Sequence, residues 1–204
     1  MIRIESLSKS YGSKKIFSQL SLEVKKGTLV VISGSNGCGK SSLLLLIAGL
    51  TTKDCGSISV CGSDNPIDYN AFCSYHFSES IYFDNRSVIT NIKLISILSK
   101  TPLITFIKEL EDFGVIDLRK KVTELSSGMK QKMKIAIAIC KKAEVYFFDE
   151  PTSNLDEHSV FVFIEKIKTL IRNGSTVVIT SHNIEHFLSL NPKHLEFNNI
   201  AKLK

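Results

Sequence analysis

The amino-acid sequence predicts an α/β fold in which a helical segment interrupts a largely parallel sheet. A continuous apolar strand at 29–32 is typical of a sheet covered on both faces. A glycine-rich loop and a leucine-rich helix over 42–50 follow this strand directly. Residues 85–140 carry helical periodicity with breaks at Pro102 and Gly114. The first two observations predict the α/β core, and the third predicts a helical insertion in it.

Alternation of apolar and polar residues at 2–7 and 20–24 favours antiparallel strands joined by a turn at 11–13. Further apolar strands are expected at 56–60, 145–148 and 176–180, the last two each preceded by a helical pattern. We therefore expect a single domain over 1–204, with an α/β core at 1–80 and 143–204, an antiparallel β subdomain, and an α-helical subdomain at about 81–142.

Composition narrows the class of protein. With 204 residues and 43% hydrophobic content, the chain fits one globular domain with a sizeable core. The longest apolar run near the start, 43–48, is far shorter than the roughly 20 residues that cross a bilayer, and no signal segment opens the chain. We expect a cytosolic protein. The five cysteines are odd in number and never spaced as CxxC, which predicts reduced thiols rather than disulfides or a zinc site.

The net charge of +6 is distributed unevenly. Between 119 and 142 there are eight lysines and arginines, opposed only by Glu124. Such a stretch can meet nucleic acid, anionic lipid or an acidic partner, but a solvated helix face is the simpler interpretation and the one we favour.

A phosphate-binding loop is the strongest motif. The pattern GxxxxGK[ST] stands between the 29–32 strand and the 42–50 helix, where its mechanism requires it. Glycines let successive N–H groups converge on phosphate oxygens, and the helix N-terminus adds partial positive charge. We expect Lys40 to reach the β- and γ-phosphates of ATP and Ser41 to ligate Mg²⁺. The candidate nucleotide-binding residues here are Gly34, Ser35, Asn36, Gly37, Cys38, Gly39, Lys40, Ser41 and Ser42.

Two adjacent carboxylates, Asp149 and Glu150, follow the apolar strand at 145–148. Asp149 is placed to hold Mg²⁺ through its water shell, and Glu150 to polarise the water that attacks the γ-phosphorus. Taken alone, the pair is an ordinary strand-end charge cluster. In an α/β chain with a phosphate loop about a hundred residues upstream, it predicts an ATPase whose α/β core is of the phosphate-loop NTPase (RecA-like) type.

The segment LSSGM at 125–129 resembles the signature of ATP-binding-cassette (ABC) proteins, usually LSGGQ. It follows the helical segment, precedes the acidic strand, and opens the helix at 129–140 with an anion-binding terminus. The resemblance implies a head-to-tail homodimer in which Ser126 and Gly128 of one subunit cover the γ-phosphate bound by the other. It also implies ATP-driven closure and transmembrane permease subunits as partners.

The resemblance covers nearly the whole chain. Tyr11 matches the aromatic residue that stacks on adenine, SNLD at 153–156 resembles the loop exchanged across the dimer, and His182 matches the switch histidine that contacts γ-phosphate. Each match has a simpler alternative when taken singly. Tyr11 can be an ordinary turn aromatic, and His182 with His186 can be read as a metal pair, although no third ligand stands at a suitable spacing.

The sequence departs from the family pattern at three points. The family usually has a glutamine that senses Mg²⁺ and the membrane partner. The corresponding position in this chain is Ser78 or Glu79, so no glutamine is assigned to that role. In the signature, Ser127 replaces the first glycine and Met129 replaces the glutamine, which adds bulk near the partner's phosphate. We expect slow basal hydrolysis from a site that is still active, since Glu150 is present.

Among ABC systems, the segment IFSQLS at 16–21, CGKSSLL at 38–44 and LSSGM resemble the ATPase of bacterial haem exporters used in cytochrome c maturation. ATPases for lipoprotein, peptide or drug export share most of these features. A non-transport ABC protein acting on ribosomes or DNA is a further alternative, but such proteins usually carry two cassettes or a long coiled-coil insert, so no nucleic acid is expected. A nucleotide sensor that only binds would be supported by loss of Lys40 or Glu150, and both are present. The resemblance places the chain at the cytoplasmic face of the inner membrane, associated peripherally through its partner.

Overall fold

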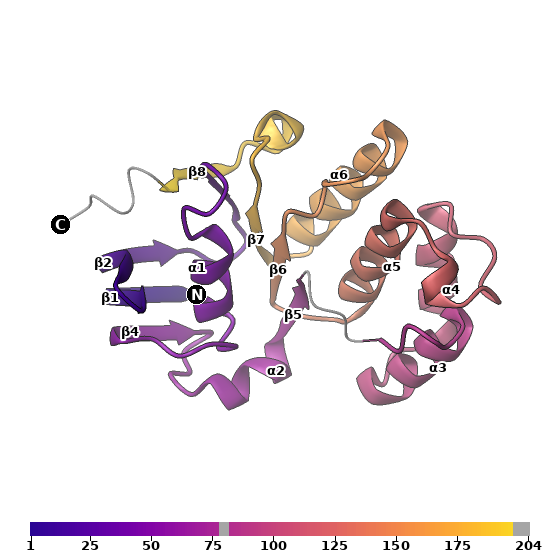
Figure 1. The fold of residues 1–204 in the computed structure, drawn as a ribbon, viewed down its shortest axis with the longest axis horizontal. Coiled ribbons are helices and arrows are strands. Elements are labelled where there is room, and N and C mark those ends of the chain that lie inside the picture. The colour runs from indigo at the N-terminus through magenta and orange to yellow at the C-terminus, as the bar shows by residue number, and fades with distance from the viewer. Residues whose placement is uncertain (78–81, 198–204) are drawn as a thin grey trace.

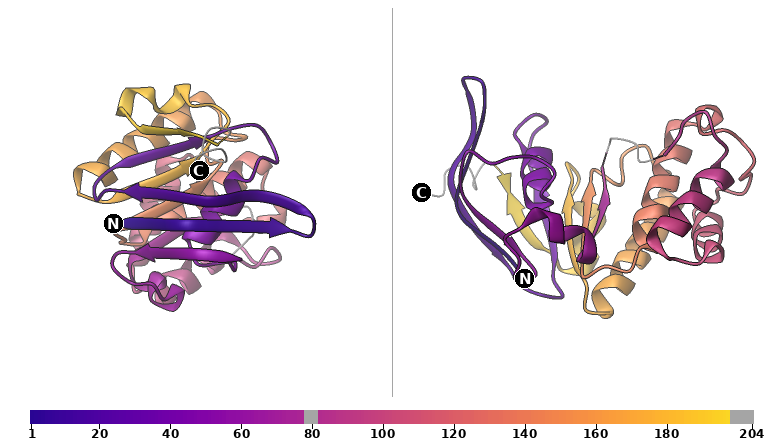
Figure 2. Two further views of the ribbon diagram at one scale, coloured as in Figure 1. Left: turned by 90° about the vertical axis from the view of Figure 1, so that its left-hand side faces the viewer. Right: turned by 90° about the horizontal axis from the view of Figure 1, so that it is seen from below.

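The computed structural model describes residues 1–77 and 82–197 and confirms the predicted α/β fold class. Figure 2 shows its layers in order: an antiparallel sheet, helix α1 (Lys40–Ile47), a parallel sheet, and a group of helices on the far side. Helices α3 (Val88–Ser99), α4 (Leu103–Asp112) and α5 (Ser127–Cys140) form the helical subdomain, at the right of Figure 1. The division of the chain at 80/81 and 142/143 stays a prediction.

The antiparallel sheet has the order β2-β1-β4. Its strands are β1 (Ile2–Tyr11), β2 (Lys14–Val24) and β4 (Cys55–Val60). The β1–β2 hairpin is longer than the alternation predicted, because its register shifts near Ser6 and Gln19, both of which have positive φ. A bulge interrupts the alternation with a period of two, so the outer half of each strand could not be recognised from the sequence. Tyr11, which was expected in the turn, is the last residue of β1.

The parallel sheet has the order β5-β6-β7-β3-β8, and every neighbouring pair in it is parallel. Its strands are β5 (Cys73–His76), β6 (Val145–Asp149), β7 (Thr176–Thr180), β3 (Leu29–Ser33) and β8 (Lys193–Glu196). The three apolar strands in the middle were predicted. The edge strands β5 and β8 were not, because each is four residues long and mixes polar with apolar side chains.

The remaining helical elements are short or cover the parallel sheet. They are α2 (Tyr69–Phe72), α6 (Glu157–Arg172) and the 3-10 helices Pro66–Asp68, Val122–Glu124 and Glu185–Leu190. The predicted breaks are confirmed: Pro102 precedes α4, and Gly114, with φ +75°, follows it closely. Helix α1 ends at Ile47, before the predicted residue 50, and Gly49, two residues later, adopts φ +72°.

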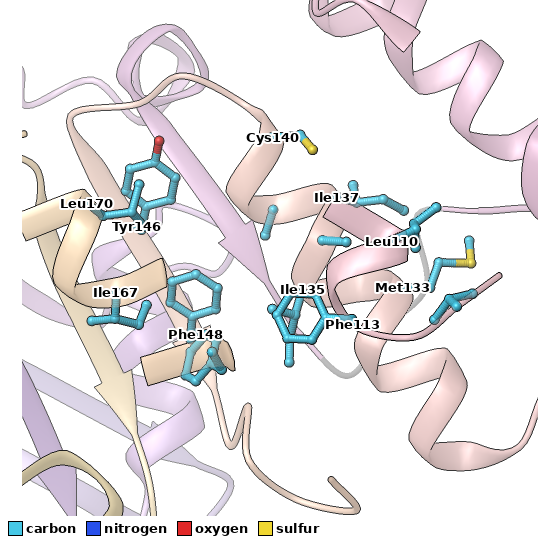
Figure 3. Packing of buried hydrophobic residues seen from close by; sticks show 14 of the residues in the cluster. Leu110, Phe113, Met133, Ile135, Ile137, Cys140, Tyr146, Phe148, Ile167 and Leu170 are labelled. Carbon is cyan, nitrogen blue, oxygen red and sulfur yellow. The ribbon is translucent and has the colours of Figure 1, made fainter. Parts of the chain in front are cut away.

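Two hydrophobic clusters hold the layers together. One fills the space between the antiparallel sheet, α1 and the facing side of the parallel sheet. The other joins β6 to α5, α6 and the helical subdomain, and Figure 3 shows Phe148 together with Phe113, Ile135 and Ile167 of this cluster. The ring of Phe148 packs edge-on against Phe163 of α6, with centroids 5.2 Å apart. The end of β6, which carries the predicted carboxylates, is therefore anchored by buried aromatic packing.

Within the described ranges, none of the helices is both long enough and apolar enough to cross a bilayer.

Candidate active site

The predicted phosphate loop lies between β3 and the first turn of α1. Gly37 adopts φ +72°, and Gly39, at the N-cap of α1, adopts φ +114°. A Cβ added at Gly39 would lie 2.4 Å from Cγ2 of Ile16 and 2.9 Å from Cζ of Phe197. Glycine at 39 is therefore required twice, by the left-handed backbone and by the close approach of these side chains. Ile16 and Phe197 therefore lie directly against the loop at Gly39.

Lys40 is almost fully buried, with 6% of its surface exposed. Its ammonium donates to the carbonyls of Gly34 at 2.8 Å and Ser35 at 3.3 Å, so the side chain folds back along the loop. A hollow of about 470 Å³ opens above the loop, lined by Ser33, Gly34, Ser35, Asn36, His182 and Ile184. The buried Lys40 ammonium contacts two of these lining residues, Gly34 and Ser35, and α1 begins at Lys40, so this position suits an anionic ligand.

Ser41 and Asp149 meet beside the loop. The Ser41 hydroxyl donates to Oδ1 of Asp149 at 3.0 Å, although 108 residues separate them. The hydroxyl of Thr180, at the end of β7, donates to the same carboxylate oxygen. A hydroxyl and a carboxylate at this separation are the oxygen donors that Mg²⁺ prefers. The residues present therefore fit the predicted metal.

Glu150 joins the other two predicted catalytic residues. One carboxylate oxygen, Oε1, lies 3.5 Å from Nζ of Lys40. The other, Oε2, accepts the backbone N–H of His182 at 3.2 Å and lies 2.9 Å from Nδ1 of its ring. The sheet order β6-β7-β3 brings these residues together, because all three follow the carboxyl ends of parallel strands.

Residues of the signature do not reach the phosphate loop of their own chain. Ser126 caps α5, its hydroxyl accepting the N–H of Met129 at 3.2 Å. Gly128 faces the 153–156 segment, where an added Cβ would lie 2.7 Å from the carbonyl oxygen of Asn154. In the part of the chain that the structure describes, no hydrogen bond joins Ser126 or Gly128 to the loop.

Tyr11 lies at the tip of the β1–β2 hairpin with 48% of its surface exposed. The ammonium of Lys9 lies 4.9 Å from its ring centroid, so the ring already serves as a cation–π partner. His186 contacts Asn183 rather than His182, with Nε2 and Nδ2 3.3 Å apart. Among the residues described, no three histidines, cysteines or carboxylates gather as a metal cluster. Ser78 and Glu79 lie outside the described residues.

Two lysines of the basic stretch at 119–142 form hydrogen bonds with groups of the same chain. The Lys132 ammonium donates to Asp156 at 2.7 Å, and Lys141 donates to the carbonyl of Cys73 at 2.6 Å. The Lys132 ammonium, together with hydrogen bonds from Ser159, holds the pKa of Asp156 below its usual value. Asp156 also caps α6 through the N–H and hydroxyl of Ser159. These lysines therefore help to fix α5 against the core.

Two residues at this site were not predicted from the sequence. Thr180 holds Asp149 through its hydroxyl and accepts the N–H of Glu150. A polar residue at the carboxyl end of a buried parallel strand was the available signal for it. Gln131 donates to the carbonyls of Glu150 and Pro151, and nothing in its sequence context marked it.

Comparison with known proteins shows the family to which this chain belongs. The family model described as "ABC transporter" matches residues 17–153 of the chain. The chain belongs to the ABC transporter family. It is an ABC-type ATPase, which confirms the prediction made from the phosphate loop, the paired carboxylates and the signature-like segment.

Several curated ABC proteins resemble this chain along most of their length. The lantibiotic transport ATP-binding protein SrtF of Streptococcus pyogenes is 30% identical, and the match covers 91% of this chain and 83% of SrtF. The uncharacterized ABC transporter ATP-binding protein YybJ of Bacillus subtilis is 32% identical, covering 97% and 93%. The glutamine transport ATP-binding protein GlnQ of B. subtilis is 32% identical, covering 90% and 81%. The names of SrtF and GlnQ refer to different cargoes and that of YybJ to none, so family membership does not identify the cargo of this chain.

Solved structures share the fold. A putative ABC transporter ATP-binding protein of Pyrococcus furiosus has a TM-score of 0.82 and 25% identity, covering 98% of this chain and 99% of that one. The ABC transporter cassette MJ0796, solved as a dimer, has a TM-score of 0.82 and 21% identity, covering 97% and 95%. At that identity, the second likeness shows the fold alone.

Proposed function

We propose that this ABC ATPase binds ATP with Mg²⁺ at the phosphate loop and hydrolyses it with Glu150 as the base, driving a transporter whose membrane-spanning subunits are separate chains. The observation that carries the proposal is the meeting of Lys40, Glu150 and His182 beside the Ser41–Asp149 pair. Residues far apart in sequence supply a phosphate-binding cation, a carboxylate and oxygen ligands at one place. Phosphoryl transfer to water requires these groups.

Each residue has a distinct task. Lys40 balances the charge of the β- and γ-phosphates, and because it now pairs with Glu150, an incoming phosphate competes with that carboxylate. Ser41 and Asp149 would hold Mg²⁺, which supplies neutralisation of phosphate charge. Glu150 accepts a proton from the attacking water at one carboxylate oxygen. His182 fixes the carboxylate through its backbone N–H and its ring, and its ring nitrogen would face the γ-phosphate.

The signature implies a partner copy. Ser126 and Gly128 stand at the N-terminus of α5, where the unpaired N–H groups of the first turn favour an anion. Their own chain presents no phosphate to them, so we propose that they cover the nucleotide of a second copy in a head-to-tail dimer. MJ0796, which shares the fold, was solved as a dimer, and this is consistent with a dimer of the present chain.

Light scattering with a slowly hydrolysing Glu150→Gln variant tests the dimer. ATP and Mg²⁺ should convert monomers into dimers, because each signature meets its phosphate only across the interface. Monomers at saturating ATP would count against the dimer. Adding Gly128→Ala to this variant is a second test. The added methyl group would displace Asn154 and should weaken dimerisation without touching the phosphate loop.

A membrane partner is supported by the outer face of α3. Ile97 and Leu98 are 74% and 73% exposed there, and Leu94 is 40% exposed. Neighbouring exposed side chains of this size typically mark a protein interface. We propose that membrane subunits cover this face and hold the ATPase peripherally at the cytoplasmic side of the inner membrane. Changing Ile97 and Leu98 to Ser should abolish co-purification with a membrane protein while leaving the ATPase rate of the isolated chain unchanged.

For the cargo, we propose haem export for cytochrome c maturation, which the segments at 16–21, 38–44 and 125–129 support. Peptide export is the second candidate, favoured by the likeness to SrtF. Purification of the tagged chain from solubilised membranes identifies the partner subunits. Stimulation of the ATPase rate of that complex by haem, and not by a lantibiotic-type peptide, would support the first candidate, and the reverse result the second.

A further inference from the structure

Gln131 connects the signature helix to the candidate base. It lies one turn inside α5, and its amide nitrogen Nε2 donates to two successive carbonyls, those of Glu150 at 3.1 Å and Pro151 at 3.0 Å. The side chain is partly buried. We call these two hydrogen bonds the Gln131 clamp. It joins the helical subdomain to the segment that follows β6.

The clamped backbone is strained. Glu150 adopts φ +45°, a left-handed conformation that a residue with a long side chain rarely takes. Such conformations persist where surrounding contacts fix them. Here the N–H of Glu150 donates to the carbonyl and hydroxyl oxygens of Thr180, each at 3.1 Å. Its carbonyl accepts from Gln131 and from the hydroxyl of Ser153 at 2.8 Å.

This conformation directs the Glu150 carboxylate. Because the backbone turns at Glu150 immediately after β6, the side chain extends back to Lys40 and His182 instead of continuing along the strand. An extended backbone at this residue would send the carboxylate elsewhere. The hydrogen bonds to the Glu150 peptide units therefore decide where the base stands.

We propose that Gln131 is a positioning residue for hydrolysis, holding Glu150 in its left-handed conformation and making the position of the base depend on the position of α5. The proposal rests on the proposed role of Glu150. Its physical basis is that the clamp spans two parts of the fold, since α5 belongs to the helical subdomain and Glu150 follows a core strand. When α5 stands where it does here, the base faces the phosphate loop.

The test replaces Gln131 with Met, which has similar length and no amide donor. Steady-state phosphate release should show kcat about tenfold lower, the consequence of losing the two hydrogen bonds that align the base. KM for ATP and the equilibrium affinity for ATP should stay within about twofold, because no phosphate contact changes. Gln19→Met, an exposed site on β2, is the matched control and should keep the original kcat.

A double-mutant cycle separates positioning from general structural damage. If Gln131 acts through Glu150, adding Gln131→Met to Glu150→Gln should slow the enzyme no further. A further slowing, or a Gln131→Met enzyme with unchanged kcat, would overturn the proposal. Should the Met variant fail to fold, Gln131→Asn, which withdraws the amide by one methylene, takes its place with the same expected result. If Glu150→Gln itself retains full activity, the proposed role of Glu150 fails instead.

Discussion

The carboxylate of Glu150 lies 3.5 Å from the ammonium of Lys40. The candidate base is therefore paired with the cation that we expect to bind the phosphates of the nucleotide. Lys40 is 6% exposed, and among the described residues its ammonium donates to two backbone carbonyls and pairs with Glu150 as its ionic partner. A buried ammonium without a carboxylate would be costly. Arrival of phosphate would replace that partner and release Glu150 for its proposed work on water.

The Lys40→Ala variant should bind ATP about a hundredfold more weakly, because a charge-assisted contact with the phosphates is lost. Equilibrium titration with a fluorescent ATP analogue measures the affinity. Lys26→Ala, which removes a lysine from an exposed pair with Glu144, is the matched control and should leave the affinity unchanged. Equal affinities of the Lys40→Ala variant and the original protein would show that Lys40 does not hold the nucleotide.

Glu150→Gln should slow hydrolysis by about a hundredfold or more while ATP still binds, since an amide keeps the shape of the side chain but accepts no proton from water. Single-turnover phosphate release gives the rate. Glu144→Gln makes the same charge change at an exposed surface pair and should have no effect. An undiminished rate in Glu150→Gln would move the base to another residue.

Restoring the signature with Ser127→Gly and Met129→Gln should raise the basal rate about fivefold, since glycine permits closer backbone approach and glutamine adds polar contacts worth roughly one hydrogen bond. Ser127 is exposed at the first position of α5, and Met129 packs partly on the core. Phosphate release without and with the membrane subunits measures the change. A double variant no faster alone would mean that neighbouring residues have adapted to Ser127.

Protein stability should fall as the pH drops from about 6.5 toward 4, through His76. Burial and then the nearby charge of Lys134 lower the pKa of this fully buried histidine from 6.5 to about 4. Between these values the unfolded chain binds a proton that the folded chain does not, so stability increases with pH and is fully present only above about 6.5. The total loss on acidification is about 3 kcal/mol, and about 2 kcal/mol at pH 5.

Urea unfolding of the original protein at pH 7 and pH 5 measures this loss. The His76→Leu variant should show a flatter dependence on pH across this window, whereas His158→Leu, an exposed site on α6, should keep the original slope. Identical slopes for the original protein and His76→Leu would mean that His76 does not account for the acid sensitivity.

The three apolar strands of the parallel sheet and the breaks at Pro102 and Gly114 could be predicted because each depends on local chemistry: apolar runs, a fixed φ, or a left-handed glycine. The edge strands β5 and β8 could not, since four mixed residues become a strand only when a neighbour pairs with them. The bulged outer half of the β1–β2 hairpin escaped prediction for a related reason, because its irregular register breaks the alternation.

By itself the sequence determined which side chains carry the chemistry and what kind of backbone surrounds them. Phosphate binding could be predicted from the glycines of the phosphate loop, Lys40 and the acidic pair at the end of β6, because that chemistry requires those residues at that spacing. Only the tertiary structure decided which of them meet. Strand order sets the contact of Glu150 with Lys40 and His182, and the left-handed turn at Glu150 directs its carboxylate. Gln131 reaches the site from α5, and Phe197 reaches it from the residue after β8. Some of these contacts join residues more than a hundred positions apart in the sequence. No local pattern could predict them, because they depend on how the sheet and helices pack.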